Sequence, residues 1–260
     1  ALHLPLLVRS DEPTSSFGQE STPYTDQETG LTMERFFGAR TTFGFAFTRS
    51  VQDTNSSSFI GQLTFPLANG VGWGAFGLTG DMEGNFILAA WPDGNGGVMS
   101  SFRQATDEDN PPEVGGNFKV RPIASGISVN DTFLTYTFLC ENCLDATLGL
   151  GPQATVGNAV MGWALSERAV SNPADPGARL GFHERGFGPF TARWASATSA
   201  GFEQIAASAG ALVGASNRAV AATPNAFGDS GDSDDEDDDE VPRGGGRGGG
   251  GAGDDSDDSD

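Results

Sequence analysis

The chain has 260 residues, with 14 lysines and arginines against 35 aspartates and glutamates, and a net charge of −21. This balance argues against nucleic-acid binding, because few cations are available to replace counterions along a phosphate backbone. No run of about 18 apolar residues is present, so the sequence predicts no transmembrane helix.

The two ends of the chain differ in composition from its middle. Residues 228–260 hold 14 of the acidic residues and 2 of the basic ones, mixed with glycine and serine. Such a segment cannot bury enough apolar surface to offset its ordering entropy, so we expect an acidic disordered tail. We divide the chain into an N-terminal extension (1–22), one domain (23–200), and an Ala/Gly/Ser linker with the tail (201–260). The first seven residues are too short for a signal peptide and are typical of the start of a mature chain or of a remnant of processing. Within the linker, 202–213 is compatible with a weak helix or an extended segment.

Short apolar segments follow one another along the middle of the chain. The clearest is 42–47, where Phe43, Phe45 and Phe47 alternate with small residues, a pattern typical of a half-buried strand. Further strands are expected at 59–67, 72–78, 85–91, 98–104, 118–123, 132–140 and 155–165. The joints between them are rich in Gly, Asn, Asp and Pro. Short strands without long helical patterns between them predict an all-β fold, an antiparallel sandwich or barrel.

Histidine is scarce, which limits the chemistry that the chain can perform. Only His3 and His183 are present, and no nucleophile-elbow motif accompanies His183, so a serine or cysteine hydrolase is disfavoured. Cys140 and Cys143 lack partners for a zinc site, and Leu-Asp follows them, which excludes c-type haem attachment. In an oxidising compartment a structural disulfide is the preferred interpretation of this pair.

Two glycosylation sequons, at Asn55 and Asn130, join the cysteine pair in favouring an extracellular protein. By themselves His183, in a Gly/Phe segment, and Met82, between Asp81 and Glu83, are ordinary loop or core residues. Nothing in their spacing connects them.

Met82 and His183 are connected by a family resemblance, which is carried by several sequence segments in the same order along the chain. The sequence is similar over residues 24–199 to the haem-binding cytochrome domain of fungal cellobiose dehydrogenase and its iron-reductase-like relatives in the DOMON group. The resemblance lies in Tyr24-Thr-Asp, the 43–47 strand, Trp73-Gly-Ala-Phe-Gly, the block from Met82 to Trp91, Phe138-Leu-Cys-Glu-Asn-Cys, Gly162-Trp-Ala-Leu-Ser, and the block from Phe182 to Phe190. It implies a β-sandwich, in keeping with the strand pattern.

The resemblance also implies a cofactor and its ligands. In the family, the methionine before the Leu-Ala-Trp strand and the histidine before the Gly-Phe turn are the axial ligands of a non-covalent haem b, and these positions match Met82 and His183. It places the family disulfide on Cys140 and Cys143. The family has a tyrosine near a haem propionate, and the corresponding residues 112–116 of this sequence contain no tyrosine. Arg103 and Arg185, from other segments, are the candidate substitutes.

With methionine on one axial position and histidine on the other, no site is open for oxygen or peroxide, and the implied role is one-electron transfer. The resemblance implies a flavin dehydrogenase as donor and a copper polysaccharide monooxygenase, a quinone or a ferric complex as acceptor, with ferric reductase activity as a further role. One alternative is a haem-free carbohydrate-binding module whose tryptophans (Trp73, Trp91, Trp163 and Trp194) stack on sugars, although their apolar strands favour core packing. Another is a fragment of a larger flavocytochrome or membrane reductase.

Overall fold

The computed structural model describes residues 18–106 and 110–224, which form strands with few helical segments. The strands are β1 Thr22–Thr25, β2 Thr32–Gly38, β3 Phe43–Ser50, β4 Phe59–Pro66, β5 Trp73–Gly77, β6 Phe86–Pro92, β7 Val98–Gln104, β8 Val114–Gly115, β9 Lys119–Val129, β10 Phe133–Glu141, β11 Ala159–Ser166, β12 Gly186–Ala192, β13 Thr198–Ser199 and β14 Val220–Ala221. The helical segments are the 3-10 helices η1 Ala146–Leu148, η2 Pro152–Val156 and η3 Trp194–Ser196, and the α-helix α1 Phe202–Ala207.

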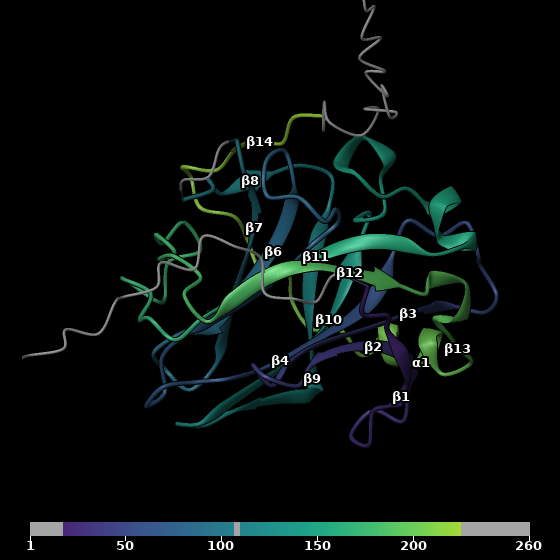
Figure 1. The fold of residues 1–260 in the computed structure, drawn as a ribbon, viewed down its shortest axis with the longest axis horizontal. Helices are drawn as coiled ribbons and strands as arrows, with labels where there is room; N and C mark the ends of the chain where they lie inside the picture. Colours follow the sequence, from purple (N-terminus) through teal and green to yellow (C-terminus); the bar gives the residue numbers. More distant parts are fainter. Residues whose placement is uncertain (1–17, 107–109, 225–260) are drawn as a thin grey trace, which may run out of the picture. The chain divides into compact units, whose positions relative to one another are not determined.

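Two sheets pack face to face (Figure 1). The larger sheet has the order β1-β2-β3-β4-β10-β9, with β13 pairing parallel to β3, and the smaller has the order β12-β11-β5-β6-β7. Apart from β13, neighbouring strands in both sheets run antiparallel. The predicted antiparallel β-sandwich is therefore confirmed.

Aromatic rings fill the space between the sheets. Phe45 of β3 stacks on Phe76 of β5 with ring centroids 4.2 Å apart, and Phe36 of β2 stacks on Phe190 of β12 at 4.5 Å. Trp194 and Trp91 are fully buried, and Trp73 and Trp163 are each 5% exposed, as expected for core tryptophans. Trp73 and Trp91 instead pack with Ala75 and Ala89 in a separate buried cluster on the other face of the smaller sheet.

The structure corrects two details of the predicted strands. The expected strand 155–165 begins only at Ala159, because Pro152 starts the 3-10 helix η2, whose first turn needs no N–H from proline. Strand β12 was not expected, since glycine and proline are depleted in strands. Pro189 is tolerated there because β12 is the edge of its sheet, where the missing N–H breaks no ladder.

The chain after Ser199 continues in contact with the sandwich. Residues 202–207 form α1, so within 202–213 the first half is helical, and Phe202 is buried. Further on, β14 pairs with β8, and the Thr223 backbone N–H donates to Gln104 Oε1 at 2.8 Å. The expected acidic tail (228–260) and His3 lie outside the described residues. No helix in the described part of the chain is long and apolar enough to cross a membrane.

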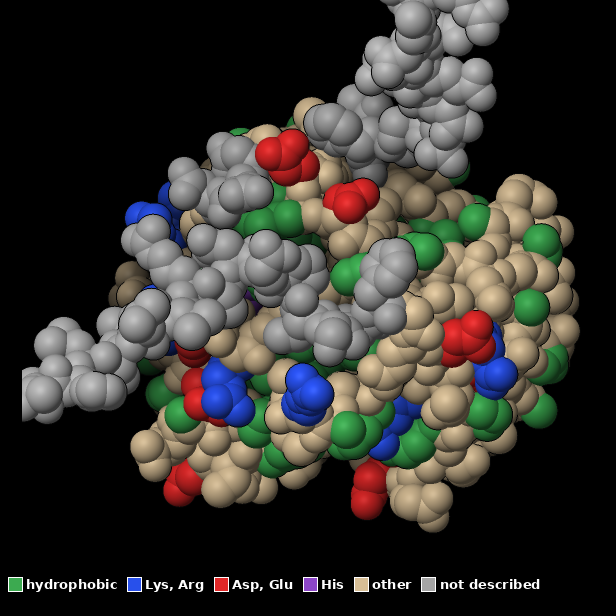
Figure 2. All heavy atoms as spheres, in the orientation of Figure 1, with side chains coloured by type: hydrophobic (Ala, Val, Ile, Leu, Met, Phe, Trp, Pro, Cys, Tyr) green, Lys and Arg blue, Asp and Glu red, His purple; other side chains and the backbone are tan. Residues whose placement is uncertain are grey.

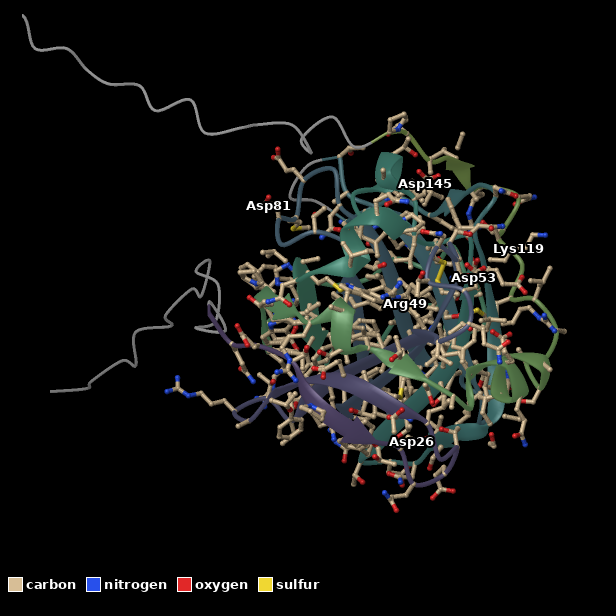
Figure 3. The ribbon with its side chains drawn as sticks, turned by 90° about the vertical axis from the view of Figure 1, so that its right-hand side faces the viewer. Asp26, Arg49, Asp53, Asp81, Lys119 and Asp145 are labelled. Carbon is tan, nitrogen blue, oxygen red and sulfur yellow. A yellow bond between two sulfur atoms is a disulfide. The ribbon has the colours of Figure 1, made fainter. Side chains whose placement is uncertain are left out.

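Cys140 and Cys143 form the expected disulfide at the end of β10. Figure 3 shows this bond near Lys119 and apart from the loop that carries Asp81. Asn55 and Asn130 are exposed on turns, which leaves both open to modification, and their glycosylation stays a prediction.

Candidate functional site

A cavity lies on the outer face of the smaller sheet. Its floor is formed by β5, β6, β11 and β12, and its walls by the loop 78–85 between β5 and β6, by residues 179–183 before β12, and by Asn110 and Pro111. The empty space, counted with its open mouth, is about 1080 Å³. Pockets of this order accommodate cofactor-sized ligands.

Small residues give the floor its depth. The alternation of side chains along a strand points Ala75 and Ala164 outward and sends Phe76 into the core. At Gly77 a β-carbon would lie 2.3 Å from Asn85 Nδ2, and at Gly162 it would lie 2.7 Å from the carbonyl oxygen of Thr79. Glycines at these positions therefore allow the 78–85 loop to approach the sheet closely.

One wall is the Met82 loop (residues 78–85), and the side chain of Asn85 holds it. Asn85 is 4% exposed, and its Nδ2 donates to the carbonyls of Thr79 (3.0 Å) and Asp81 (2.6 Å). Its Oδ1 accepts from the Thr79 N–H at 3.1 Å, and its backbone N–H donates to the Met82 carbonyl at 3.2 Å. These bonds satisfy backbone groups on both sides of Met82, whose half-buried side chain lines the cavity.

The opposite wall is the His183 loop (residues 167–185, between β11 and β12), where aromatic rings surround the imidazole. The ring centroid of His183 is 4.3 Å from that of Phe187 and 4.6 Å from that of Phe182, and the Trp73 ring meets it edge-on at 6.4 Å. The next residue, Glu184, anchors the loop. Its carboxylate accepts from Ser166 Oγ and from a backbone N–H of the same segment, both at 2.8 Å.

Burial in this apolar wall lowers the pKa of His183, with the nearby carboxylate of Glu184 opposing the shift. The neutral imidazole, the form that ligates metals, is thus favoured. Among the described residues, no group hydrogen-bonds to His183 Nδ1 or to Trp73 Nε1, although both atoms are buried. Unsatisfied buried nitrogens on residues that line a cavity fit a site that takes a further group. A thioether and an imidazole at the edges of an apolar cavity fit a haem.

The structure brings Met82 and His183, from loops far apart in the sequence, to the same cavity. Neither Arg103 nor Arg185, the suggested propionate partners, lines it. Arg103 is 1% exposed and donates to backbone carbonyls, and Arg185 pairs with Glu167 at 3.0 Å. The arginine that does line the cavity is Arg179, which the sequence analysis missed because it lies in a loop without any motif.

Known proteins share this fold. The cytochrome domain of Myriococcum thermophilum cellobiose dehydrogenase superposes with a TM-score of 0.66 and 26% identity, over 75% of this chain and 98% of that one. The cytochrome b domain of pyranose dehydrogenase from Coprinopsis cinerea gives 0.62 and 26%, over 72% and 95%. The fold is therefore that of the β-sandwich cytochrome domains.

The sequence comparisons define the family. The model of the cytochrome domain of cellobiose dehydrogenase matches residues 24–204. A pyrroloquinoline quinone-dependent pyranose dehydrogenase from Coprinopsis cinerea is 32% identical over 165 residues, 62% of this chain but only 22% of that protein. This chain belongs to the family of the cytochrome domain of cellobiose dehydrogenase. It spans about a fifth of the length of the curated relative.

Proposed function

We propose that this cytochrome domain holds one non-covalent haem b between Met82 and His183 and transfers single electrons. The observation that carries the proposal is that these two side chains, from separate loops, line one apolar cavity. The family to which the chain belongs supports it further.

Each ligand has a defined task in this proposal. His183 supplies a neutral imidazole, since burial lowers its pKa, and the surrounding rings restrict its orientation. Met82 supplies a soft, uncharged thioether, which raises the reduction potential relative to a second imidazole. A haem iron between them supplies a one-electron change without ligand exchange. If both residues bound the iron, no position would be open for oxygen or peroxide, which disfavours peroxidase and oxygenase chemistry.

The haem-free carbohydrate-binding module is the weaker alternative. Stacking on a sugar requires an aromatic ring with an open face, and all four tryptophans are at most 5% exposed. Trp91 in addition donates its indole N–H to the Pro173 carbonyl at 2.8 Å, which fixes it in the fold. The exposed aromatic ring at the cavity, Phe182, is 45% exposed and packs against His183.

Redox partners follow from the relatives. We propose that the donor is a dehydrogenase that carries a flavin or a quinone cofactor, and that the acceptor is a copper polysaccharide monooxygenase, a quinone or a ferric complex outside the cell. The chain would then be one part of a larger flavocytochrome-like enzyme or its separate partner. Rapid mixing of the oxidised protein with a sugar dehydrogenase and its sugar should reduce the haem. Absence of reduction with dehydrogenases of both cofactor classes would overturn this assignment.

The cofactor assignment is tested by titrating the haem-free protein with haemin. We expect one equivalent to bind and to give a six-coordinate, low-spin spectrum in both oxidation states. Met82→Leu should convert it to a five-coordinate, high-spin form. Met99→Leu, an equally conservative change outside the cavity, should not. No binding, or identical spectra for the two variants, would overturn the proposed ligand set.

A further inference from the structure

The cavity has an apolar floor, but its polar lining is uneven in charge. Asp81, at the tip of the Met82 loop, places a carboxylate on one wall, and Arg179, before the His183 segment, is the single lysine or arginine among the described lining residues. Figure 3 labels Asp81 at the periphery of the fold. The carboxylates of a ligand with an apolar body would therefore be repelled at the Asp81 wall and attracted toward Arg179.

Arg179 is exposed, and it forms no ion pair with another described residue. The buried and part-buried arginines of the described chain are already engaged: Arg49 and Arg103 with carbonyls, Arg121 with Glu141, Arg193 with Glu34, and Arg35 over the rings of Tyr24 and Phe37. On the face drawn in Figure 2, basic and acidic side chains are interspersed, so neither sign of charge dominates it. A free guanidinium at a cavity mouth is thus available to a bound anion.

Asn110 stands beside Arg179 in the lining. Its Oδ1 accepts from the Leu180 backbone N–H at 2.8 Å, which ties it to the segment that carries Arg179. With its oxygen occupied in this way, Asn110 can offer its Nδ2 amide as a donor toward the cavity. The two residues therefore present hydrogen-bond donors from adjacent positions on the rim.

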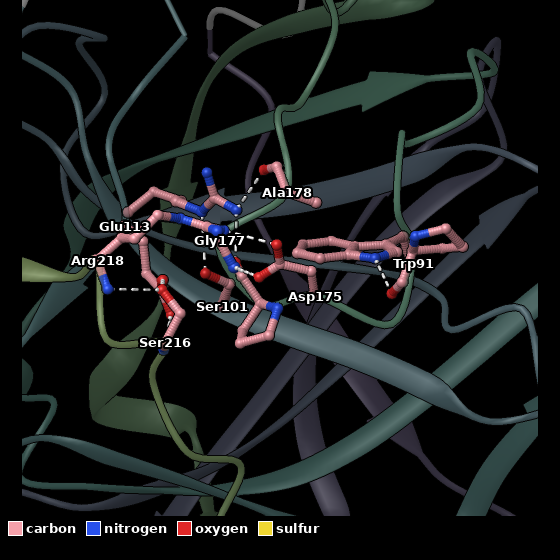
Figure 4. A network of polar contacts seen from close by, with 11 residues as sticks. Trp91, Ser101, Glu113, Asp175, Gly177, Ala178, Ser216 and Arg218 are labelled. Carbon is pink, nitrogen blue, oxygen red and sulfur yellow. Dashed lines mark hydrogen bonds and ion pairs between the residues drawn. The ribbon is translucent and has the colours of Figure 1, made fainter.

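A buried arginine fixes the rim segments that bear these two residues. The Arg103 guanidinium donates to the carbonyls of Pro176 and Ala178, both at 2.7 Å, and to that of Pro111 at 3.2 Å (Figure 4). Burial lowers the pKa of Arg103 to about 10, with the nearby carboxylate of Glu113 opposing the shift, so the group stays charged at neutral pH. Since three charge-assisted bonds hold the backbone on either side of the rim, its donors are preorganised.

We propose that Arg179 and Asn110 form the subsite for the two carboxylates of the bound tetrapyrrole, its propionates. This rests on the proposed haem function. Carboxylates that sit at the mouth of an apolar cavity need charged or polar partners, because desolvation without a partner is costly. The subsite orients the cofactor with its propionates away from Asp81.

The test compares two forms of the cofactor: haem, and haem with both propionates converted to methyl esters. Arg179→Gln should weaken haem binding roughly tenfold, the usual effect of losing one charge-assisted hydrogen bond, measured as the rate of haem transfer to a scavenging protein. It should leave the affinity for the diester unchanged, because the partner charge is already absent. Arg40→Gln, the same charge change at an exposed site outside the cavity, should affect neither.

Asn110→Asp separates the two donors. The aspartate keeps an oxygen for the Leu180 N–H but replaces the amide with a negative charge, so haem affinity should fall while the diester binds as before. Equal losses for haem and diester in either variant, or no loss for haem, would overturn the subsite while leaving haem binding intact. If the unaltered protein bound neither form, the proposed function itself would fail.

Discussion

The Met82 loop and the His183 loop line the same cavity but are fixed in different ways. In the Met82 loop one buried amide, Asn85, bonds to backbone groups within six residues of itself. The His183 loop is held by groups from distant parts of the chain, with Trp73 of β5 against the imidazole and Ser166 of β11 bonded to Glu184. The side-chain hydrogen bonds that shape one wall are thus local, whereas those that shape the other come from the assembled sheet.

The turns that close the two loops both require a glycine. Gly84 has φ +69° and donates its N–H to Ala105, and Gly186 has φ +138° and donates its N–H to the His183 carbonyl. Glycine adopts such angles without strain, and other residues rarely do. We therefore expect a change in the Met82 loop to leave the His183 imidazole undisturbed, whereas a change around His183 should also disturb its contacts with β5 and β11.

The largest effect is expected for His183→Ala. Loss of a direct ligand should lower haem affinity more than the ~10–100-fold typical of residues that only support a ligand. Added free imidazole should restore a low-spin spectrum, because the cavity remains. The measurement is a haemin titration. An unchanged affinity and spectrum would mean that the His183 loop provides no ligand.

Asn85→Ala should have the next largest effect. It removes three hydrogen bonds of a buried side-chain amide and leaves the Thr79 and Asp81 carbonyls without these donors, so the free energy of unfolding should fall by about 2–4 kcal/mol. Asn85→Asp keeps the acceptor and loses the donors. Its free energy of unfolding, measured with urea on the haem-free protein, should lie between those of the unaltered protein and Asn85→Ala. If Asn85→Ala also disturbed the imidazole of His183, observed by NMR, the two walls would not be independent.

A smaller effect is expected for Glu184→Gln. The amide retains one acceptor oxygen but loses the charge that Arg168 faces at 3.5 Å, and the Arg168 side chain is largely exposed. We expect a loss of about 1 kcal/mol in urea unfolding. Glu83→Gln, an exposed change on the other loop, is the control and should be neutral. Equal effects of the two changes would show that Glu184 does not anchor its loop.

The same contrast explains what could be predicted from the sequence. Alternating segments such as Phe43–Phe47 record strand geometry directly, so the sandwich was predictable. Met82 and His183 were found through their resemblance to a family, because no local pattern connects two residues on separate loops. Arg179 and the role of Asn85 were not found, since each depends on which backbone groups the folded loops bring together.

The central claim, that Met82 and His183 are the two ligands of one haem, is tested most directly by potentiometry on Met82→His. The account predicts that the haem stays six-coordinate and low-spin while its midpoint potential falls. A fall of about 59 mV would be a tenfold change in the one-electron equilibrium. Imidazole stabilises ferric iron better than a thioether does, so the direction is fixed by the ligand alone. A midpoint potential equal to that of the unaltered protein would show that Met82 is not coordinated, and would contradict the account.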